Sequence, residues 1–517
     1  MRLFLLALTF CAATAAQAAD TFAFPLQPGP HAVGLQVKQQ YDRSRVYKTR
    51  VSLVTGKPAS GERARPMQML VWYPAARGGK PVTFRDYYAT GATEADLTLD
   101  AAEVGRITDA QLAEQISGWP AGAEAVARPM WAVRDAPAKP GKFPVVIYAP
   151  SFSAGAAENA DLCEYLASHG YIVLASVSQG AHQRSMTLDV EGVETQAADI
   201  AWLISQAGTM ANADTDRLAV AGFSWGGLAN VVAAARDDRI KALVSLDGSV
   251  RYFPDMVDGG KAAIPYVTPA RVAVPMLYVA QRPATIEELN RNEKSTGFSL
   301  LNRMTYADVY VVTMHPMQHR HFSAQGLHLA RDGEFDGDYT RDDVTAAYGW
   351  MARYVHRFLD GYLKDDAAAR TFMANKPVAN GVPRHMVSLD ARPGSGVPPT
   401  LENFAAQLAA RGFDNAAAIH DELKAQGATF KLEPHDINSW GYELLRGGMA
   451  RESVAIFRFG TQLHPKDANL YDSLGEAQAK AGQREAAIDN YRRSLALNPK
   501  NANAVERLKA LGAPAAP

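Results

Sequence analysis

The stretch that decides the fold runs from Asp214 to Arg236, DTDRLAVAGFSWGGLANVVAAAR. An apolar run, Leu218–Ala221, is followed by a G-x-S-x-G sequence around Ser224 and then by small and branched residues. This order predicts a buried strand, a sharp turn and a helix, the setting in which G-x-S-x-G presents a reactive serine. The glycines are needed because the turn leaves no room for side chains beside the serine. We therefore predict that Ser224 is a nucleophile at the end of a strand.

Short apolar runs on both sides of this stretch alternate with amphipathic segments. Helical patterns such as NADLCEYLASHG and VETQAADIAWLISQAG separate the runs. Apolar strands that alternate with helices are typical of a mostly parallel sheet covered by helices on both faces. Because a G-x-S-x-G turn lies inside the series, the pattern predicts the α/β-hydrolase architecture. The runs are Phe143–Pro150, Tyr171–Val177, Ile240–Gly248, Val274–Ala280 and Asp308–Met314.

Several motifs, taken in their order along the chain, resemble one branch of that fold. VWYPAA at Val71–Ala76, GFSWGG, VSLDGS and HRHFSA are similar to motifs of the platelet-activating-factor acetylhydrolase and dienelactone-hydrolase-like α/β-hydrolases. The resemblance covers roughly residues 30–360. It implies a Ser-His-Asp triad with Ser224 as nucleophile. In that branch the acid follows the sixth strand, and the histidine lies in an H-x-x-F segment after the last strand.

The resemblance implies that the triad acid is Asp247, at the end of ALVSLDG. An aspartate before Gly248 is also a common turn residue, so a purely structural role is one alternative. A second alternative is Glu287 or Glu288, which follow the next apolar run, where many other α/β-hydrolases keep their acid. Their segment, TIEELNRNEK, reads as a polar helix. We therefore predict that these glutamates face solvent and that Asp247 is the acid.

The segment TMHPMQHRHFSAQG, Thr313–Gly326, contains three histidines. A triad needs one imidazole in the loop after the last strand, with one ring nitrogen on the serine and the other on the carboxylate. His319 occupies the H-x-x-F position and is the predicted base, and His321 is the alternative base. His315 precedes a proline, which favours an extended backbone over a free loop. A metal site stays as a further alternative because His315 and His319 have i, i+4 spacing, although no acidic residue lies nearby.

Two backbone N–H groups are predicted to stabilise negative charge on a substrate oxygen. The first belongs to Trp225, directly after the nucleophile. The second, by its position after the strand Phe143–Pro150, belongs to Phe152. Relatives in the branch named above usually carry His-Gly there, whereas this chain has Pro150-Ser151. This departure leaves open whether the oxyanion hole is weakened.

The first residues, MRLFLLALTFCAATAAQAAD, have a positive start at Arg2, an apolar run and small residues that end in Ala16-Gln17-Ala18. This order predicts a signal peptide over residues 1–19, because the apolar run is too short for a comfortable membrane span. We expect a periplasmic or secreted protein with no transmembrane anchor after cleavage. Cys163 would then be the one cysteine left, which excludes an internal disulfide.

The organisation of the chain changes near residue 375. Residues 20–375 are predicted to form the α/β-hydrolase domain, within which residues 77–142 are an insertion with helical patterns. The insertion is either a lid that shapes the pocket or a set of peripheral helices. Residues 376–400 are rich in proline and glycine and predict a linker. Residues 401–517 predict a helical domain.

This helical domain contains an internal repeat. Trp440–Pro465 aligns with Leu474–Pro499, 34 positions further on, with glycines, an aromatic residue and the final proline in register. The period and pattern resemble the tetratricopeptide repeat, with repeats at about residues 436–469 and 470–503. Two repeats bury little core, so the helices from Leu401 are expected to stack on them. The domain either binds a protein partner or braces the hydrolase or a dimer, because a repeat fold does not fix function.

Charge excludes some classes of function. Lysine plus arginine (53) nearly balance aspartate plus glutamate (54), which gives no bulk attraction to nucleic acid or to anionic membranes. We expect an exported serine hydrolase that cleaves small-molecule carboxylic esters and needs no cofactor or metal. The alternative is a weakly catalytic or noncatalytic scaffold that holds a protein partner, or a second copy of itself, through the tetratricopeptide-like repeats.

Overall fold

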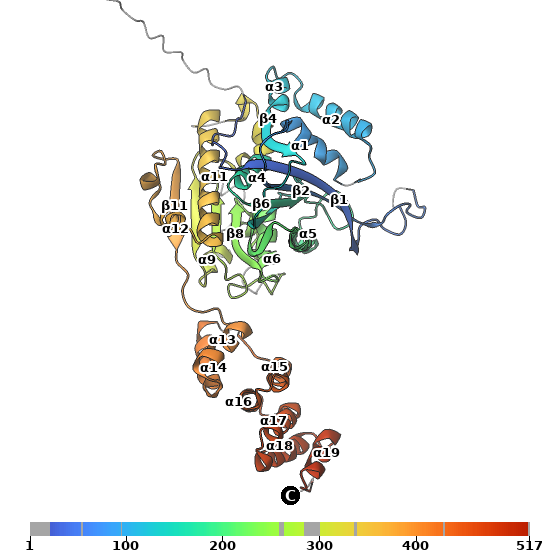
Figure 1. The fold of residues 1–517 in the computed structure, drawn as a ribbon, viewed down its shortest axis with the longest axis vertical. Coiled ribbons are helices and arrows are strands. Elements are labelled where there is room, and N and C mark those ends of the chain that lie inside the picture. Colours follow the sequence, from blue (N-terminus) through green and yellow to red (C-terminus); the bar gives the residue numbers. More distant parts are fainter. Residues whose placement is uncertain are drawn as a thin grey trace, which may run out of the picture. The chain divides into compact units, whose positions relative to one another are not determined.

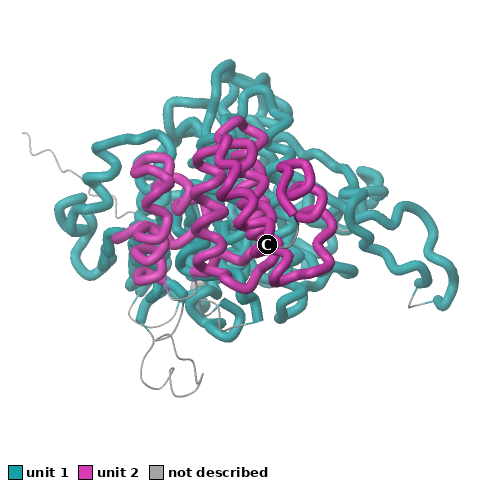
Figure 2. The backbone as a smooth tube through the Cα atoms, turned by 90° about the horizontal axis from the view of Figure 1, so that it is seen from below, with its two compact units in different colours: residues 1–394 teal, residues 395–517 magenta. Residues whose placement is uncertain are grey.

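The structure is a computed structural model that describes residues 21–52, 55–94, 96–257, 263–283, 300–335, 339–427 and 430–514. The chain divides into two compact units, Met1–Gly394 and Ser395–Pro517 (Figure 2). The predicted signal peptide, residues 1–19, lies outside the described residues. No helix among the described residues is long and apolar enough to cross a membrane.

The first unit is built on one large sheet, in the order β11-β10-β9-β8-β7-β5-β6-β2-β1-β4-β3 (Figure 1). Its centre, from β6 to β10, is parallel throughout. The pairs β1–β2, β2–β6, β3–β4 and β10–β11 are antiparallel. The strands are β1 Ala32–Val46, β2 Ala64–Ala75, β3 Pro81–Thr83, β4 Pro129–Arg134, β5 Phe143–Ala149, β6 Ile172–Ser176, β7 Ala213–Phe223, β8 Ile240–Leu246, β9 Met276–Ala280, β10 Val309–Met314 and β11 Val387–Arg392.

Helices cover both faces of this sheet, as the apolar runs predict. Successive residues of a strand point to opposite faces, so Val146 belongs to the apolar core on one side and Val145 and Ile147 to the core on the other. Helices α4 and α11 pack on the first face, and α5 and α6 on the second. The helices of this unit are α1 Phe84–Thr90, α2 Ala101–Gln115, α3 Gly122–Ala127, α4 Ala160–Ser168, α5 Val190–Gly208, α6 Trp225–Ala234, α7 Pro254–Val257, α9 Leu300–Arg303, α10 Ala324–Leu329, α11 Arg341–Leu363 and α12 Ala367–Ala374.

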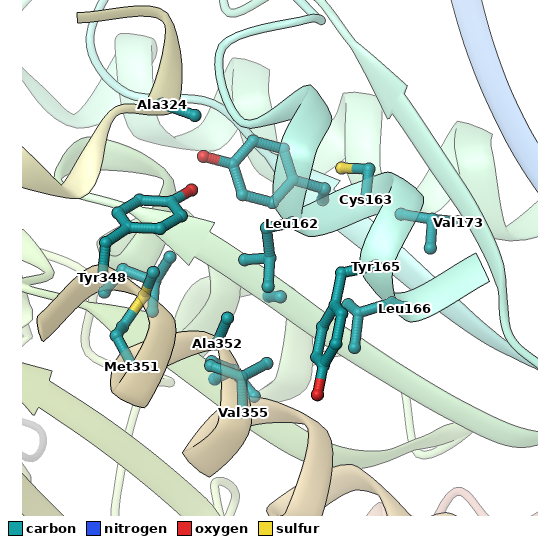
Figure 3. Packing of buried hydrophobic residues seen from close by; sticks show 14 of the residues in the cluster. Leu162, Cys163, Tyr165, Leu166, Val173, Ala324, Tyr348, Met351, Ala352 and Val355 are labelled. Atoms are coloured by element: carbon teal, nitrogen blue, oxygen red, sulfur yellow. The ribbon is translucent and has the colours of Figure 1, made fainter. Parts of the chain in front are cut away.

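Helix α4 is buried along its whole length. Figure 3 shows Leu162 and Leu166 of α4 in the same apolar cluster as Ala352 and Val355 of α11. The short sequence ENADLCEYLASHG therefore forms an internal helix that also carries acidic side chains, and these need partners inside the protein. Asp161 and Glu164 of α4 contact other segments, which are discussed below.

The predicted linker, residues 376–400, is wrong in its first part. Val387–Arg392 forms strand β11, which pairs antiparallel with β10 from Val309↔Arg392 to Met314↔Val387. The strand is half exposed and alternates only weakly between apolar and polar residues, and the prolines and glycines around it indicated a loop. The sheet therefore continues to Arg392, and the boundary between the units follows Gly394.

The insertion, residues 77–142, is more than a group of helices. It contributes α1, α2 and α3, but it also extends the sheet, because β4 pairs in parallel with β1 and β3 pairs with β4. Helix α2 begins after Asp100, whose side chain accepts hydrogen bonds from the backbone N–H groups of Ala102 and Glu103. The base of the insertion is thus fixed to the sheet edge.

The second unit is a stack of helices. Gly441 lies where a side chain would meet the ring of Phe457, and Gly475 lies in the same way against Tyr491. These contacts explain why the small and aromatic positions recur along the sequence. Phe404 and Ile419 from the first two helices share a core with Phe457. The helices are α13 Leu401–Arg411, α14 Ala416–Gln426, α15 Pro434–Arg446, α16 Ala450–Leu463, α17 Ala468–Lys480, α18 Arg484–Leu497 and α19 Ala502–Ala510.

Candidate active site

Ser224 sits in a tight turn between β7 and α6, as the sequence predicts. Its backbone has φ 52° and ψ −114°, a conformation that costs energy for a residue with a side chain. The neighbouring glycines make the turn possible: a Cβ on Gly226 would lie 2.1 Å from the carbonyl oxygen of Ala149. A Cβ on Gly222 would lie 2.7 Å from the carbonyl carbon of Gly226. The turn is therefore pressed against the end of β5.

Ser224, His319 and Asp247 lie in one hydrogen-bonded chain. His319 Nε2 is 2.9 Å from Ser224 Oγ, and His319 Nδ1 is 2.6 Å from Asp247 Oδ2. Asp247 is fully buried, whereas the His319 side chain is 44% exposed. One ring nitrogen thus faces the hydroxyl while the other is held by a carboxylate, so the imidazole can accept the hydroxyl proton.

Asp247 follows β8 with φ 40°. Its backbone N–H donates to Val279 O at 2.6 Å, which anchors it to β9. Its second carboxylate oxygen accepts a hydrogen bond from the backbone N–H of Gln281 at 3.1 Å. The turn position before Gly248 and the contact with His319 therefore coexist in one residue. The rival acids Glu287 and Glu288 lie outside the described residues.

Gln281 was not predicted from the sequence. Its side-chain oxygen accepts from the backbone N–H of His319 at 2.9 Å, while its own backbone N–H donates to Asp247. Gln281, at the end of β9, therefore holds both His319 and Asp247 in place. The one signal in the sequence is its place directly after an apolar run, at the carboxyl end of a parallel strand, where functional side chains gather.

The three histidines occupy three different environments. His321 is buried, with Nδ1 accepting from the backbone N–H of Gln318 at 3.1 Å and its ring stacked on Phe335 at 5.5 Å. His315 Nε2 lies 3.2 Å from Ser388 Oγ on β11. Of the three, His319 is the one that meets Ser224. Among the described residues no group of histidine, cysteine, aspartate or glutamate side chains is arranged to hold a metal ion.

The side chains of Trp225 and Phe152, the two residues predicted to supply oxyanion donors, contact each other. Trp225 is the first residue of α6, so its N–H has no acceptor within the helix. The rings of Phe152 and Trp225 are in edge contact at 5.8 Å. Ser151, at the position where relatives carry glycine, donates from both its backbone N–H and its hydroxyl to the carboxylate of Glu158. The serine that replaces this glycine thus has its own hydrogen-bond partner, Glu158.

Two buried glutamates lie close to this loop. Burial raises the pKa of Glu158 to about 7, although hydrogen bonds from Ser151 and the charge of His319 act in the opposite direction. Burial likewise raises the pKa of Glu94 to about 7 against the attraction of Arg184. A cavity of about 470 Å³ lies beside Glu94 and is lined by the insertion and by the loops after β5 and β6. Whether the insertion acts as a lid stays a prediction.

One family model and one solved structure are similar to parts of this chain. A family model described as Chlorophyllase matches residues 105–252, which include Ser224 and Asp247 but make up less than half of the chain. A solved structure of a ferulic acid esterase from Streptomyces cinnamoneus is similar over 67% of this chain and 94% of its own, with 20% sequence identity and a TM-score of 0.42. The mostly parallel sheet with helices on both faces, and the turn at Ser224 between β7 and α6, give the first unit the α/β-hydrolase fold, and the family match is consistent with a carboxylic ester hydrolase.

Curated relatives match a shorter stretch. Cellulose synthase operon protein C of Escherichia coli, and a putative protein of the same description from the same species, are 27% identical to this chain over 90 residues. The match takes in 17% of this chain and 8% of each relative, so the chain spans a small part of their length. The chain thus consists of a unit with the α/β-hydrolase fold, followed in sequence by a unit of helical repeats that resemble tetratricopeptide repeats.

Proposed function

We propose that the first unit hydrolyses carboxylic esters through an acyl-enzyme formed on Ser224. One observation carries the proposal: the hydrogen bonds of His319 join Ser224 on one side to Asp247 on the other. A serine hydroxyl is a weak nucleophile unless an adjacent base removes its proton, and that base must be oriented by a third group. All three roles have a residue here.

The steps follow from the geometry. Ser224 Oγ attacks the ester carbonyl carbon while His319 Nε2 takes the hydroxyl proton, and Asp247 stabilises the charged imidazole. The carbonyl oxygen becomes an oxyanion, for which the N–H groups of Trp225 and Phe152 are the proposed donors. His319 then gives the proton to the departing alcohol oxygen. Water, deprotonated by His319, attacks the acyl-enzyme, releases the carboxylic acid and restores the Ser224 hydroxyl.

The finer assignments rest on the sequence. The motifs around the triad favour the platelet-activating-factor acetylhydrolase and dienelactone-hydrolase-like branch, with a small-molecule ester as substrate. The leader favours export to the periplasm or the medium, where a single remaining cysteine would suit an oxidising compartment. The reaction as proposed uses side chains and backbone N–H groups of this chain alone.

The alternative is a scaffold in which the helical domain carries the function. The similarity to part of cellulose synthase operon protein C and the paired helices from α13 to α19 support an interaction role for that domain. An interaction role and an esterase role are compatible, so the decisive question is whether Ser224 reacts.

A fluorophosphonate probe answers that question. We expect the full-length protein to be labelled, and peptide mapping to place the label on Ser224, because the probe needs an activated serine. The variant Ser224→Ala is the matched control and should stay unlabelled. A folded protein that is not labelled, and that cleaves no p-nitrophenyl ester, would favour the scaffold. The same peptide map tests export, since protein recovered from the periplasm should begin near Ala19 or Asp20 rather than at Met1.

A further inference from the structure

The loop after β5 is held by a buried carboxylate. Glu158, which is 4% exposed, accepts hydrogen bonds from the backbone N–H of Ser151 at 2.8 Å and from the Ser151 hydroxyl at 2.5 Å. The hydroxyl of Tyr148 on β5 donates to the same carboxylate at 3.3 Å. Both donors of Ser151 thus converge on one side chain, and this serine stands immediately before Phe152, the second proposed oxyanion donor.

The same short segment also reaches the loop that carries His319. The backbone carbonyl of Glu158 accepts from the backbone N–H of Gln325 at 2.9 Å. The next residue, Asn159, donates to Phe322 O at 2.9 Å and accepts from the backbone N–H of Ala324 at 2.8 Å. Glu158 and Asn159 therefore join the loop of the proposed oxyanion donor to the loop of the proposed base.

Neighbouring positions of the loop are fixed in a similar way. Pro150 O accepts from the Gln196 side chain at 2.7 Å. Ser153, with φ 57°, accepts from Arg184 at its carbonyl and from the backbone N–H of Met186 at its hydroxyl. Within the part of the chain that the structure describes, the backbone N–H of Phe152 meets no acceptor. The hydrogen bonds of Pro150, Ser151 and Ser153 hold the loop on both sides of Phe152, and the Phe152 N–H is available to a ligand.

We propose that Glu158 is a positioning residue that acts through Ser151 to aim the Phe152 N–H at the oxyanion formed on Ser224. The inference rests on the proposed function. In relatives that carry His-Gly, a glycine occupies the place of Ser151. Here Ser151 adds a hydroxyl, whose hydrogen bond to Glu158 comes in addition to that of the backbone N–H. The two bonds fix the backbone before Phe152, so the replacement of glycine by serine does not weaken the oxyanion hole.

Glu164 provides a matched control on the following helix, α4. It is 1% exposed and accepts from the Tyr87 hydroxyl at 2.6 Å and from the backbone N–H groups of Trp131 at 2.6 Å and Ala132 at 3.0 Å. Its partners are also two backbone or hydroxyl donors and a tyrosine, but they belong to the insertion rather than to the oxyanion loop. A loss of buried hydrogen bonds as such should affect both glutamates alike.

The experiment compares Glu158→Ala, Glu158→Gln, Ser151→Ala and Glu164→Ala in the full-length protein, with p-nitrophenyl acetate as substrate. We expect kcat of Glu158→Ala to fall about 10- to 100-fold with KM within about twofold, less than the loss on removing an oxyanion donor, since the N–H is misdirected rather than absent. Ser151→Ala, which keeps one of the two bonds, should fall about threefold to tenfold. Glu158→Gln should recover most of kcat, because its amide can still accept from the Ser151 N–H and donate to the Ser151 hydroxyl.

Inhibition by a trifluoromethyl ketone is a second measurement, and it would not change if Glu158 contributed only to stability. Ser224 Oγ adds to the carbonyl carbon of the unhydrated ketone and forms a tetrahedral hemiketal oxyanion, so the inhibition constant of the ketone should rise in Glu158→Ala by the same factor by which kcat/KM falls. Glu164→Ala should melt at a lower temperature, yet keep kcat and ketone affinity. If Glu158→Ala does not fold, Ser151→Ala and Glu158→Gln carry the test.

Three outcomes would overturn the inference. The first is that Ser151→Ala and a folded Glu158→Ala both keep the kcat and the ketone affinity of the wild type. The second is an equal loss of kcat in Glu164→Ala, which would show that burial alone matters. The third is a Glu158→Gln variant as impaired as Glu158→Ala. In each case a wild-type protein labelled at Ser224 would leave the proposed function standing, whereas an unlabelled wild type would remove both.

Discussion

At the scale of single residues, the site is a chain of contacts made by side chains that are far apart in the sequence. Ser224, Asp247 and His319 meet because each follows a strand of the same parallel sheet or lies in the loop after one. Carboxyl ends of parallel strands lie at one edge of a sheet, so residues after those strands are brought together. The spacing of the triad therefore follows from the topology.

The clearest residue-scale prediction concerns the histidines. His319→Ala should lower kcat by about 10⁴-fold, as loss of a triad member typically does. His321→Ala should leave most of kcat, because His321 is buried against Phe335 and bonds to Gln318. His315→Ala should do the same, since its contact is with Ser388. Steady-state kinetics on p-nitrophenyl acetate measure all three.

The outcome of that series distinguishes His319 as the base from His321 as the base and from a metal site. A large loss in His321→Ala with an active His319→Ala would move the base by two positions and keep the mechanism. Equal losses in all three, together with inhibition by a chelator, would replace the triad with a histidine metal site.

Motifs in the sequence point to the three residues that the structure brings into one hydrogen-bonded chain, but not to residues whose contacts are all tertiary. Ser224 lies in G-x-S-x-G, Asp247 ends an apolar run and His319 begins H-x-x-F, so each carries a local signal. Glu158 and Gln281 carry no motif. Their roles depend on which backbone N–H groups the fold brings to them, and no spacing in the sequence encodes that.

At the scale of elements, the sheet extends further than the apolar pattern indicates. The six central strands were predictable because both of their faces are buried, which leaves continuous apolar runs. Strand β11 was missed because it is an edge strand with one exposed face, and the prolines around it resemble a linker. Strands β3 and β4 were missed for a different reason: they are short strands inside a segment that reads as helical.

The element scale yields a prediction about where the chain can be cut. A chain that ends at Gly394 keeps β11 and should be soluble and retain kcat on small activated esters. A chain that ends at Lys376 lacks the partner of β10 and exposes an unpaired row of backbone groups. It also loses the bond from the backbone N–H of His315 to Met386 O. We expect it to melt at a lower temperature and to aggregate.

Light scattering and thermal melting of the two chains, side by side, provide the measurement. Equal stability would show that β11 contributes little to the sheet. Loss of activity in a folded chain ending at Gly394 would show instead that the helical domain contributes to the site.

At the scale of the whole molecule, buried acids make stability depend on pH. Burial raises the pKa of Glu94, Glu158 and Glu164 to about 7, from an ordinary value of 4.5. Between these values the unfolded chain releases protons that the folded chain keeps, so the free energy of unfolding falls as pH rises from about 4.5 to 7. His169 acts in the opposite direction, because burial lowers its pKa to about 4.

The pKa values of three carboxyl groups are raised and that of one imidazole is lowered by a similar amount, so the carboxyl groups determine how the free energy of unfolding changes with pH. We therefore expect urea unfolding to require less denaturant at pH 8 than at pH 5, and Glu164→Gln to show a smaller difference between the two pH values. A protein more stable at pH 8 than at pH 5 would contradict this expectation.

Helix α4 has a consequence for anyone who redesigns this protein. Its acids are bonded to groups contributed by other segments: Glu164 to the amides of Trp131 and Ala132 on β4, and Asp161 to His328 on α10. An engineer who exchanges the insertion for one with a different substrate preference would orphan Glu164 unless the replacement restores two amide donors at that place. Libraries that vary residues 84–127 other than Tyr87, whose hydroxyl also donates to Glu164, and that retain the β4 backbone should therefore yield far more folded members than libraries that replace the whole insertion.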